Sequence, residues 1–365
     1  MTYPKLEIHL PKLHHNAKML VEMCRKKGIE IVAVTKVFLG DPEIARTLVE
    51  AGIPMLADSR ISNIKKLKEI PVPKMMLRIP MLSEIEEVIE YADISINSEI
   101  EVMERISQTA LKKGCQHQVI LMIDLGDLRE GIWEDEADEI IEKIIALRGI
   151  RLVGLGANFG CYGGVIPEKH TLEKLVEMKK RIEQRYGIQI LYLSGGNSNS
   201  LHLIWENQMP EEINQLRLGE PIVLGKEDVY DKTIEGLYDD AFCLFGEIVE
   251  IKTKPSVPIG KRGVDAFGHI PQFVEKGMRK RAILALGRQD ILLDGIKPKD
   301  ANVTVLGASS DHLILDITDA QEAYRVGDIV ELKMNYGALL AAMTSAYVAK
   351  EIIRQPDKKE KGKFQ

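Results

Sequence analysis

The sequence predicts an α/β protein in which a (β/α)8 TIM barrel is followed by a smaller all-β domain. Short apolar, β-rich runs alternate with amphipathic helical patterns through the first ~225 residues. After about residue 240 the strand-like runs continue, but no long helices separate them. The chain has 365 residues, which suggests two domains at roughly 100–200 residues each.

The barrel is predicted from eight apolar runs and the helical patterns between them. Segments such as DPEIARTLVEAG and LSEIEEVIEYA repeat apolar residues at three- and four-residue spacing, as helices that cover a sheet do. Continuous apolar strands indicate a parallel sheet buried on both faces, and eight units favour closure over an open doubly wound sheet. A flanking helix is expected over 11–28. In order, the runs are EIVAVT (30–35), MLA (55–57), KMMLRI (74–79), ISIN (94–97), QVILMID (118–124), RLVGLGAN (151–158), QILYLSG (189–195) and LRLGEPIVLG (216–225).

The second domain is predicted from strand-like runs that Pro, Gly and Asp turns separate. The segment YGALLAAMTSAYVAKEII (336–353) predicts a closing helix, and the segment 226–241 lacks apolar periodicity and contains the boundary. We therefore expect a cofactor-binding barrel domain over 1–230, a β-domain over 231–355 and a charged tail over 356–365. The runs are FGEIVEIKTK, RAILALG, VTVLGA, LILDIT and DIVELKM.

Composition excludes several classes of partner. The 49 Lys and Arg against 55 Asp and Glu give a formal charge of −6, without a strongly basic region, which argues against nucleic acid. No apolar stretch approaches the ~20 residues of a membrane span, and no signal peptide is visible at the N-terminus. The 4 cysteines are scattered without a CxxC pair, so we expect a cytoplasmic protein and no metal site.

Polar residues follow several of the predicted strands, and in a barrel the site lies at those C-terminal ends. Lys36 is the most informative, because it comes between the apolar segments EIVAVT and VFL. Such a lysine can extend its ammonium group to water. Alternatively, burial favours a neutral amine that forms a Schiff base. The other strand-end residues include Asp58, Asn97, Asp124, Arg129, Asn158, the segment 195–198 and Arg217.

A second signal comes from SGGNSNS (194–200) together with RLGE (217–220). Glycines let backbone N–H groups approach an anion, and Ser198 adds a hydroxyl. The loops after strands seven and eight are the common phosphate site of this barrel, although a Gly/Ser/Asn turn alone is weak evidence. A lysine amine and a phosphate cradle across one barrel mouth predict pyridoxal 5′-phosphate as the cofactor.

These residues belong to an ordered series that resembles the fold type III pyridoxal-phosphate enzymes, the alanine racemase family. The resemblance runs over essentially the whole chain, and it is strongest to the racemases that act on ornithine. It implies an amino-acid racemase, with lysine or alanine as alternative substrates. The segments that carry it are VTKVFLGDPEIA (34–45), ADSRISNIKKLK (57–68), DLGDLREGI (124–132), CYGGVIP (161–167), SGGNSNSLHL (194–203), RLGE (217–220), KPSVPIG (254–260), SSDHLILDITD (309–319) and NYGALLAAMTS (335–345).

The resemblance implies roles for individual residues. Lys36 would be the Schiff-base lysine and one of two acid/base groups, and Arg217 would face the pyridine nitrogen. Asn158 stands where the family has a histidine stacked on the pyridine, and Arg129 matches an arginine near the substrate carboxylate. Such racemases are head-to-tail homodimers in which the β-domain of one chain completes the other's site. The implied phosphate ligands are Asn197, Ser198, the backbone of Gly219 and Glu220, and Tyr336.

The sequence departs from the family at the opposite-face base. The family tyrosine sits in a G-Y-x-D context, and the corresponding stretch AILALGRQD places Arg288 there. Arginine is a poor general base at neutral pH, so we expect Arg288 to orient the substrate carboxylate or to act on a neighbour's pKa. The candidates for the second acid/base are Cys161, Tyr162, Asp290 and His312. A distal substrate ammonium needs a carboxylate, and Asp265, Asp290 and Asp311 are candidates, although each also fits an ordinary turn.

Three other functions fit parts of the pattern. A protein that binds pyridoxal phosphate without turnover would share the barrel but would leave the β-domain without a task. A decarboxylase of this fold would carry a cysteine signature in its second domain, where only Cys243 is present. An aldolase that uses Lys36 without a cofactor is the remaining alternative.

Overall fold

The computed structural model describes residues 2–355, which form two compact units. One unit is Pro11–Asp239, and the other joins the chain up to Leu10 to the chain from Asp240 onward. The division into a cofactor-binding domain over 1–230 and a β-domain over 231–355 stays a prediction. The predicted tail 356–365 lies outside the described residues.

The first unit is a closed barrel of eight parallel strands, with β9 pairing back onto β2. This confirms the predicted barrel, and each strand begins within three residues of its apolar run. The long final run ends early as a strand, because a short helix follows Gly219. The strands are β2 (Glu30–Val34), β3 (Met55–Asp58), β4 (Lys74–Met76), β5 (Ile94–Asn97), β6 (His117–Met122), β7 (Ile150–Gly156), β8 (Tyr192–Asn197) and β9 (Gln215–Leu218).

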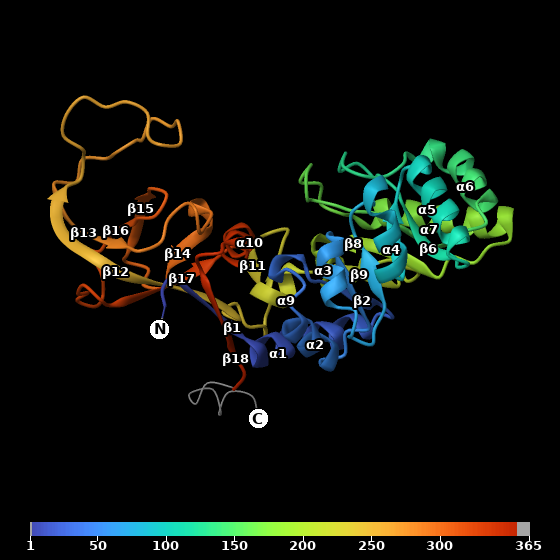
Figure 1. Cartoon of the computed structure of the whole chain (residues 1–365), viewed down its shortest axis with the longest axis horizontal. Helices are drawn as coiled ribbons and strands as arrows, with labels where there is room; N and C mark the ends of the chain where they lie inside the picture. Colours follow the sequence, from blue (N-terminus) through green and yellow to red (C-terminus); the bar gives the residue numbers. More distant parts are fainter. Residues whose placement is uncertain (1, 356–365) are drawn as a thin grey trace. The chain divides into compact units, whose positions relative to one another are not determined.

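Helices follow the strands and surround the barrel (Figure 1). Local sequence explains where they start and stop. The Asp41 side chain accepts the backbone N–H groups of Glu43 and Ile44 at the start of α2, and Pro42 fits the first helical position. The helix α7 ends at Gly187, whose φ of 66° suits glycine. The helices are α1 (Leu10–Arg25), α2 (Pro42–Glu50), α3 (Ile61–Lys66), α4 (Ile85–Tyr91), α5 (Ile100–Lys112), α6 (Ala137–Ala146), α7 (Lys169–Tyr186), α8 (His202–Trp205) and α9 (Glu220–Leu224).

The barrel core has two faces, as strand β6 illustrates. Ile120 and Met122 pack in a cluster built from the strands alone, while Val119 and Leu121 pack in a second cluster with residues of α5, α6 and α7. Successive side chains of a strand point to opposite faces, so both faces of this strand are buried. The apolar run without alternation that the sequence shows is the consequence.

The second unit is an antiparallel β structure that also includes the N-terminal strand. β1 (Lys5–His9) pairs antiparallel with β12 and parallel with β18. The sheet order is β14-β17-β12-β13-β16-β15. The other strands are β12 (Phe242–Pro255), β13 (Met278–Leu284), β14 (Ile296–Pro298), β15 (Thr304–Ala308), β16 (Leu313–Asp316), β17 (Ile329–Met334) and β18 (Ala349–Ile353).

The closing helix predicted over 336–353 is shorter than expected. The helix α10 (Tyr336–Thr344) ends where Ser345 adopts an extended backbone, and the chain continues as β18. The last part of the predicted helix, AKEII, pairs with β1 along its whole length. A partner strand that is distant in the sequence therefore overrides the local helical pattern.

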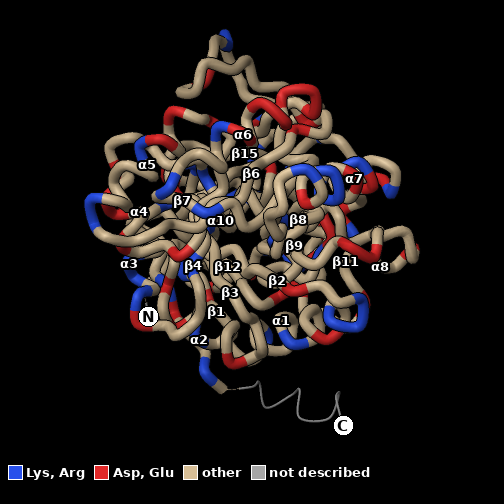
Figure 2. Tube along the Cα trace, turned by 90° about the vertical axis from the view of Figure 1, so that its right-hand side faces the viewer, with Lys and Arg blue, Asp and Glu red and all other residues tan. Residues whose placement is uncertain are grey.

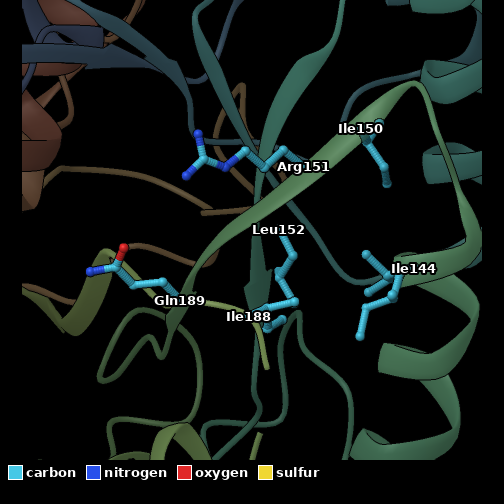
Figure 3. A pocket seen from close by; sticks show the side chains of 7 residues that line it. Ile144, Ile150, Arg151, Leu152, Ile188 and Gln189 are labelled. Carbon is cyan, nitrogen blue, oxygen red and sulfur yellow. The ribbon is translucent and has the colours of Figure 1, made fainter. Parts of the chain in front are cut away.

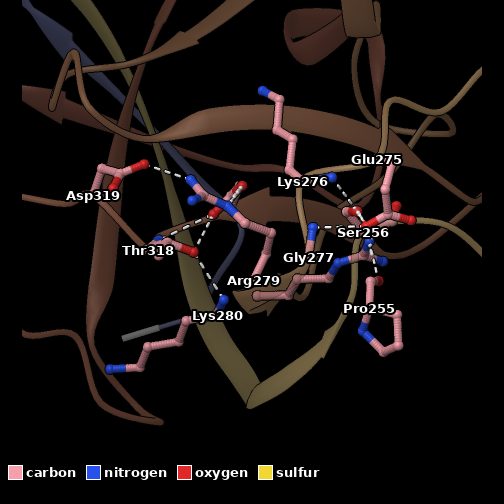
Figure 4. Close-up of polar contacts among 11 residues, drawn as sticks. Pro255, Ser256, Glu275, Lys276, Gly277, Arg279, Lys280, Thr318 and Asp319 are labelled. Carbon is pink, nitrogen blue, oxygen red and sulfur yellow. Dashed lines mark hydrogen bonds and ion pairs between the residues drawn. The ribbon is translucent and has the colours of Figure 1, made fainter.

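A long loop leaves the hairpin of β12 and β13, and its base is closed by polar contacts (Figure 4). The Ser256 hydroxyl accepts the backbone N–H of Lys276 at 2.7 Å and donates to the Glu275 carboxylate at 3.0 Å. On the neighbouring strand, the Arg279 guanidinium pairs with Asp316 at 2.8 Å. These contacts fix the two ends of the loop to the sheet.

Charged residues of both signs are interleaved along the helices of the barrel unit (Figure 2). A mixed surface of this kind has no large field of one sign, in keeping with the formal charge of −6. Across residues 2–355, the structure contains no helix of the length and apolarity that a membrane span requires.

Candidate active site at the mouth of the barrel

Lys36 lies directly after β2, at the C-terminal end of the barrel strands, and is half-buried. The preceding residue is fixed to the next strand, because the Thr35 hydroxyl donates to the Asp58 carboxylate at 2.6 Å and to the Ala57 carbonyl at 3.2 Å. Burial raises the pKa of Asp58, while Thr35, Arg60 and Asn63 offset part of that effect with hydrogen bonds. The lysine therefore starts from a rigid backbone position.

Ser198 and Gly219 lie at the ends of β8 and β9. The Gly219 N–H points to the Ser198 hydroxyl at 3.4 Å, so both groups belong to one small donor cluster. The two glycines of SGGNSNS have a packing reason as well. A Cβ at Gly195 would lie 2.7 Å from the Ile213 side chain, and Gly196 has a φ of 112°.

The side chain of Asn197 is occupied by the loop that follows β7. Its Nδ2 donates to the Phe159 carbonyl at 2.8 Å and contacts the Cys161 Sγ at 3.0 Å. Its Oδ1 accepts the N–H of Asn199 at 3.2 Å. These contacts position the loop after β7 against β8, so the structure gives this amide a positioning role beside the predicted phosphate site.

Arg217 is the buried cation of the site, 5% exposed within β9. It donates to the Ser194 hydroxyl and, at 2.7 Å, to the Ala157 carbonyl. Burial lowers its pKa to about 10, with Glu130 opposing that shift and Arg129 adding to it. The guanidinium stays charged at neutral pH, as its predicted role beside a pyridine nitrogen requires.

Arg129 lies in the loop after β6, among three polar neighbours. Its guanidinium pairs with the Glu130 carboxylate through two nitrogens. With its amide oxygen turned toward Arg129, Asn158 accepts from the two terminal nitrogens at 2.6 and 3.0 Å. Burial acts to lower the pKa of Arg129, but Glu130 and Cys161 outweigh it and the pKa is raised. Asn158 thus holds an arginine of the site.

The loop 160–163, which carries Cys161 and Tyr162, is held by a single carboxylate. Asp127 is 2% exposed and accepts the N–H groups of Gly160 at 2.9 Å, Gly163 at 3.0 Å and Tyr162 at 3.3 Å. The Cys161 thiol contacts Asn197 and hydrogen-bonds with Arg129. The Tyr162 side chain is exposed. Of these two candidates, Cys161 is the one in contact with the site residues.

The structure reveals one site residue that the sequence interpretation did not include. Asp228 follows β10 (Lys226–Glu227), in the segment taken as the domain boundary, and Ser198 acts to lower its pKa. Its Oδ1 is buried without a hydrogen-bond partner among the described residues. Burial, Glu220 and Glu227 raise its pKa to about 8, and Ser198 and Lys36 oppose that shift. The only sequence signal was a pair of acids shortly after RLGE.

The remaining candidates lie in the second unit, where most of them build turns. Asp290 is 2% exposed and accepts the Gly287 N–H at 3.0 Å and the Ser345 hydroxyl at 3.1 Å. Arg288 donates to the Ala308 carbonyl at 3.1 Å and lies over the ring of Phe267 at 4.7 Å.

Three further candidates of this unit are exposed or mark the start of a helix. His312 contacts the Asp311 carboxylate at 2.9 Å. Asp265 accepts the N–H groups of Phe267 and His269, each at 2.9 Å. Tyr336 is the first residue of α10. Within this unit, the contacts of Asp265, Asp290 and Asp311 therefore agree with the alternative that they belong to ordinary turns.

The donor groups of the barrel mouth fit a phosphorylated aldehyde. Ser198 offers a hydroxyl and Gly219 offers a backbone N–H, and the two groups lie in one cluster. Lys36 and Ser198 both act on the pKa of the Asp228 carboxyl. A hydroxyl, a backbone N–H and a lysine amine are the donors that a phosphate and a nearby carbonyl require.

The site is distinct from the pocket shown in Figure 3. That pocket has a volume of about 280 Å³ and lies at the start of β7, where Ile150, Arg151 and Leu152 line it with residues of α6 and of the segment before β8. The start of a barrel strand is the end opposite to the one where barrel enzymes carry their active sites.

Comparisons with known proteins agree with this geometry. A family profile described as "Alanine racemase, N-terminal domain" matches residues 8–225. The chain is 45% identical over 352 residues to the ornithine racemase of Acetoanaerobium sticklandii, covering 96% of this chain and 100% of that protein. It is 46% identical over 352 residues to the lysine racemase of Thermotoga maritima, covering 96% and 98%. The crystal structure of an alanine racemase from Streptomyces lavendulae superposes with a TM-score of 0.76 at 16% identity, covering 99% of both chains.

Proposed function

We propose that this chain, which belongs to the alanine racemase family and is a pyridoxal-phosphate-dependent amino-acid racemase, interconverts L- and D-ornithine. The observation that carries the proposal is the cluster of Lys36, Ser198, Arg217 and Arg129 at the C-terminal ends of the barrel strands. An ornithine racemase that matches 96% of this chain supports the substrate.

The proposed cofactor site uses groups from four strand ends, those of β2, β7, β8 and β9. The phosphate would be held by Ser198, by the backbone of Gly219 and Glu220 and, through Asn197, by the loop after β7. Lys36 would bond to the aldehyde. Arg217 would face the ring nitrogen and keep it unprotonated, because its charge persists at neutral pH. Once bound, the cofactor supplies the carbonyl carbon and the conjugated ring that acidify the Cα–H of the substrate. Lys36 then moves the Cα proton on one face.

Arg129 is proposed to bind the substrate carboxylate. Its guanidinium is already oriented by Glu130 and by Asn158, so little side-chain freedom is lost when a carboxylate binds. Asn158 is proposed to hold this arginine in addition to lying beside the cofactor. Arg288 remains a second proposed carboxylate contact.

Inversion by two acid/base groups also needs a proton donor on the face opposite Lys36, and we propose Cys161 as the first candidate. A thiol titrates close enough to neutral pH to exchange a proton. The thiol of Cys161 accepts a contact from the Asn197 amide at 3.0 Å, and Cys161 acts to raise the pKa of Arg129, which places it beside the candidate site residues. Tyr162, Asp290 and His312 remain alternatives, which alanine variants of each residue distinguish by their residual activity.

The substrate is tested by incubating the purified protein and pyridoxal phosphate with L-ornithine, L-lysine or L-alanine in parallel. We expect D-ornithine as the product with the highest kcat/KM when each mixture is separated by chiral chromatography. Lysine is the second candidate, since a lysine racemase is 46% identical over the same share of the chain. Absence of D-ornithine at full cofactor occupancy would remove the ornithine proposal.

We also propose a head-to-tail homodimer in which the β-domain of one chain, which carries Arg288, completes the partner's site, as the resemblance implies. Sedimentation at increasing protein concentration tests the dimer. Mixing Lys36→Ala with Arg288→Ala chains tests the shared site, because a mixed dimer would contain one intact site and recover activity if Arg288 acts in the partner's site. Location in the cytoplasm stays a proposal that cell fractionation tests.

A further inference from the structure

Asp127 lies in the loop that follows β6, and that loop is closed by its own hydrogen bonds. The Asp124 carboxylate accepts the N–H groups of Gly126 at 2.8 Å and of Leu128 at 3.2 Å, on either side of Asp127. At the base of the loop, the Asp124 N–H donates to the Ile132 carbonyl at 3.0 Å. Asp127 is 2% exposed. Its backbone is therefore fixed, and its buried side chain has a defined direction.

The Asp127 carboxylate binds the loop that follows the next strand, β7. Its Oδ1 accepts the N–H groups of Gly160 at 2.9 Å and of Gly163 at 3.0 Å, and its Oδ2 accepts the N–H of Tyr162 at 3.3 Å. A Cβ at Gly163 would lie 2.8 Å from the Asp127 carbonyl oxygen, so this close approach of the two loops requires glycine. One carboxylate thus holds the backbone on both sides of Cys161.

The loop after β7 also contacts two residues of the candidate site. The Phe159 carbonyl accepts the Asn197 Nδ2 at 2.8 Å, and the Cys161 Sγ contacts the same nitrogen at 3.0 Å. Near the start of the loop, the Asn158 amide oxygen, turned toward Arg129, accepts from that guanidinium at 2.6 and 3.0 Å. The position of this loop therefore sets where Cys161 lies relative to the proposed carboxylate-binding arginine and the proposed phosphate site.

We propose that Asp127 is a positioning residue for the proton transfer on the face opposite Lys36, because it fixes the loop that carries Cys161. Asp124 accepts N–H groups within four residues of itself, whereas Asp127 accepts them 33 to 36 residues away and so joins two strand ends. Proton transfer needs hydrogen-bond reach, and a displacement of about 1 Å can cost about 10²-fold in rate. The inference rests on the proposed racemase function and adds a residue to which the resemblance gave no role.

The test compares two substitutions of Asp127 in the full-length enzyme, with the amino acid that the wild type racemises. Asp127→Ala removes all three hydrogen bonds, so kcat should fall by about 10²-fold while KM changes by less than about threefold. Asp127→Asn keeps an Oδ1 that can accept the two shorter bonds, and its kcat should stay within about fivefold of the wild type. The matched control is Glu183→Ala, which removes a carboxylate that accepts the Ile190 N–H at 2.9 Å before β8. It should keep the wild-type kcat.

Three further measurements separate positioning from a general loss of stability. In D2O, Asp127→Ala should still exchange the Cα proton of the enantiomer whose Cα–H faces Lys36, about tenfold faster than it inverts that enantiomer. In a double-mutant cycle, adding Asp127→Ala to Cys161→Ala should lower kcat by less than about threefold, because the loop then carries no thiol to position. In the cofactor-free protein, backbone hydrogen exchange over 158–164 should be faster in Asp127→Ala and unchanged in Glu183→Ala.

Several results would overturn this role of Asp127 and leave the racemase proposal standing. They are a wild-type kcat in Asp127→Ala or in Cys161→Ala, full additivity of the two substitutions, and unchanged hydrogen exchange over 158–164. An equal loss of exchange and inversion for both enantiomers would also overturn it, since the effect would then not belong to one face. If the cofactor-loaded wild type racemises no amino acid, the proposed function is wrong, and the role of Asp127 in proton transfer is wrong with it.

Discussion

The two units of this chain use polar side chains in different ways. In the barrel unit, Arg217 and Arg129 are held by neighbouring groups with their charges preserved, and Glu130 acts on both. In the second unit, Asp290 and Asp265 accept backbone N–H groups within a few residues of themselves. The contacts of the two arginines join different strand ends of the barrel. Asp265 closes its own turn, and Asp290 closes a turn and also accepts the Ser345 hydroxyl at the end of α10.

This contrast applies to the acids that the sequence offered as partners for a substrate ammonium. Asp265, Asp290 and Asp311 all have local hydrogen-bond partners. Their contacts agree with the turn alternative within their own unit. Among the described residues, the barrel unit contains two acids with a buried oxygen that lacks a hydrogen-bond partner, Asp138 on α6 and Asp228 after β10.

The largest effect should come from the barrel mouth. Lys36→Ala removes both the amine that bonds to the aldehyde and one acid/base group, so racemase activity should fall by about 10³-fold or more. Chiral chromatography measures the rate. Thermal unfolding should change little, and Lys68→Ala, at an exposed lysine, should behave as the wild type. Activity within tenfold of the wild type would break the assignment of the site to the barrel mouth.

Arg129→Gln should lower kcat/KM by about 10²-fold, mainly through KM, because a charge-assisted contact to the carboxylate is lost. Steady-state kinetics with ornithine measures this split. The matched control is Arg148→Gln at an exposed arginine. An unchanged KM would show that Arg129 does not bind the substrate and would favour Arg288 for that role.

Within the barrel, the end opposite the site should contribute stability and not catalysis. His117 at the start of β6 is buried and contacts the Ser95 hydroxyl at 2.9 Å. Burial lowers its pKa to about 4, with Asp93 opposing. The folded protein therefore binds fewer protons than the unfolded chain, so stability is full above pH 6.5 and falls toward pH 4. The free energy of unfolding, measured with urea, should fall by about 2 kcal/mol between pH 7 and pH 5 because of this group. The free energy of unfolding of His117→Gln should fall by correspondingly less over the same pH range.

The smallest effect concerns Asp290. Asp290→Asn keeps the shape but loses a carboxylate acceptor, so unfolding free energy should fall by about 1 kcal/mol. If Asp290 only closes its turn, kcat/KM of the folded variant stays near the wild-type value. A hundredfold loss of activity with normal unfolding would instead place Asp290 in the chemistry and would blur the contrast between the units.

Local pattern predicted the barrel well because its strands are buried on both faces and its helices are amphipathic. It failed where distant pairing decides the structure: AKEII is a strand because β1 covers its edge. The candidate site residues Lys36, Ser198 and Arg217 could be proposed from the sequence because the strand ends of a barrel converge. Asp228 could not be proposed, because the segment around it has no periodicity that would indicate a buried acid. Its burial depends on the turn that the Glu227 carboxylate forms.

The most direct test of the central claim is to reduce the cofactor-loaded enzyme with borohydride and to locate the modified lysine by peptide mass spectrometry. We expect a single pyridoxyl adduct on the peptide that contains Lys36. An adduct on another lysine, or no adduct in a protein that racemises ornithine, would contradict it.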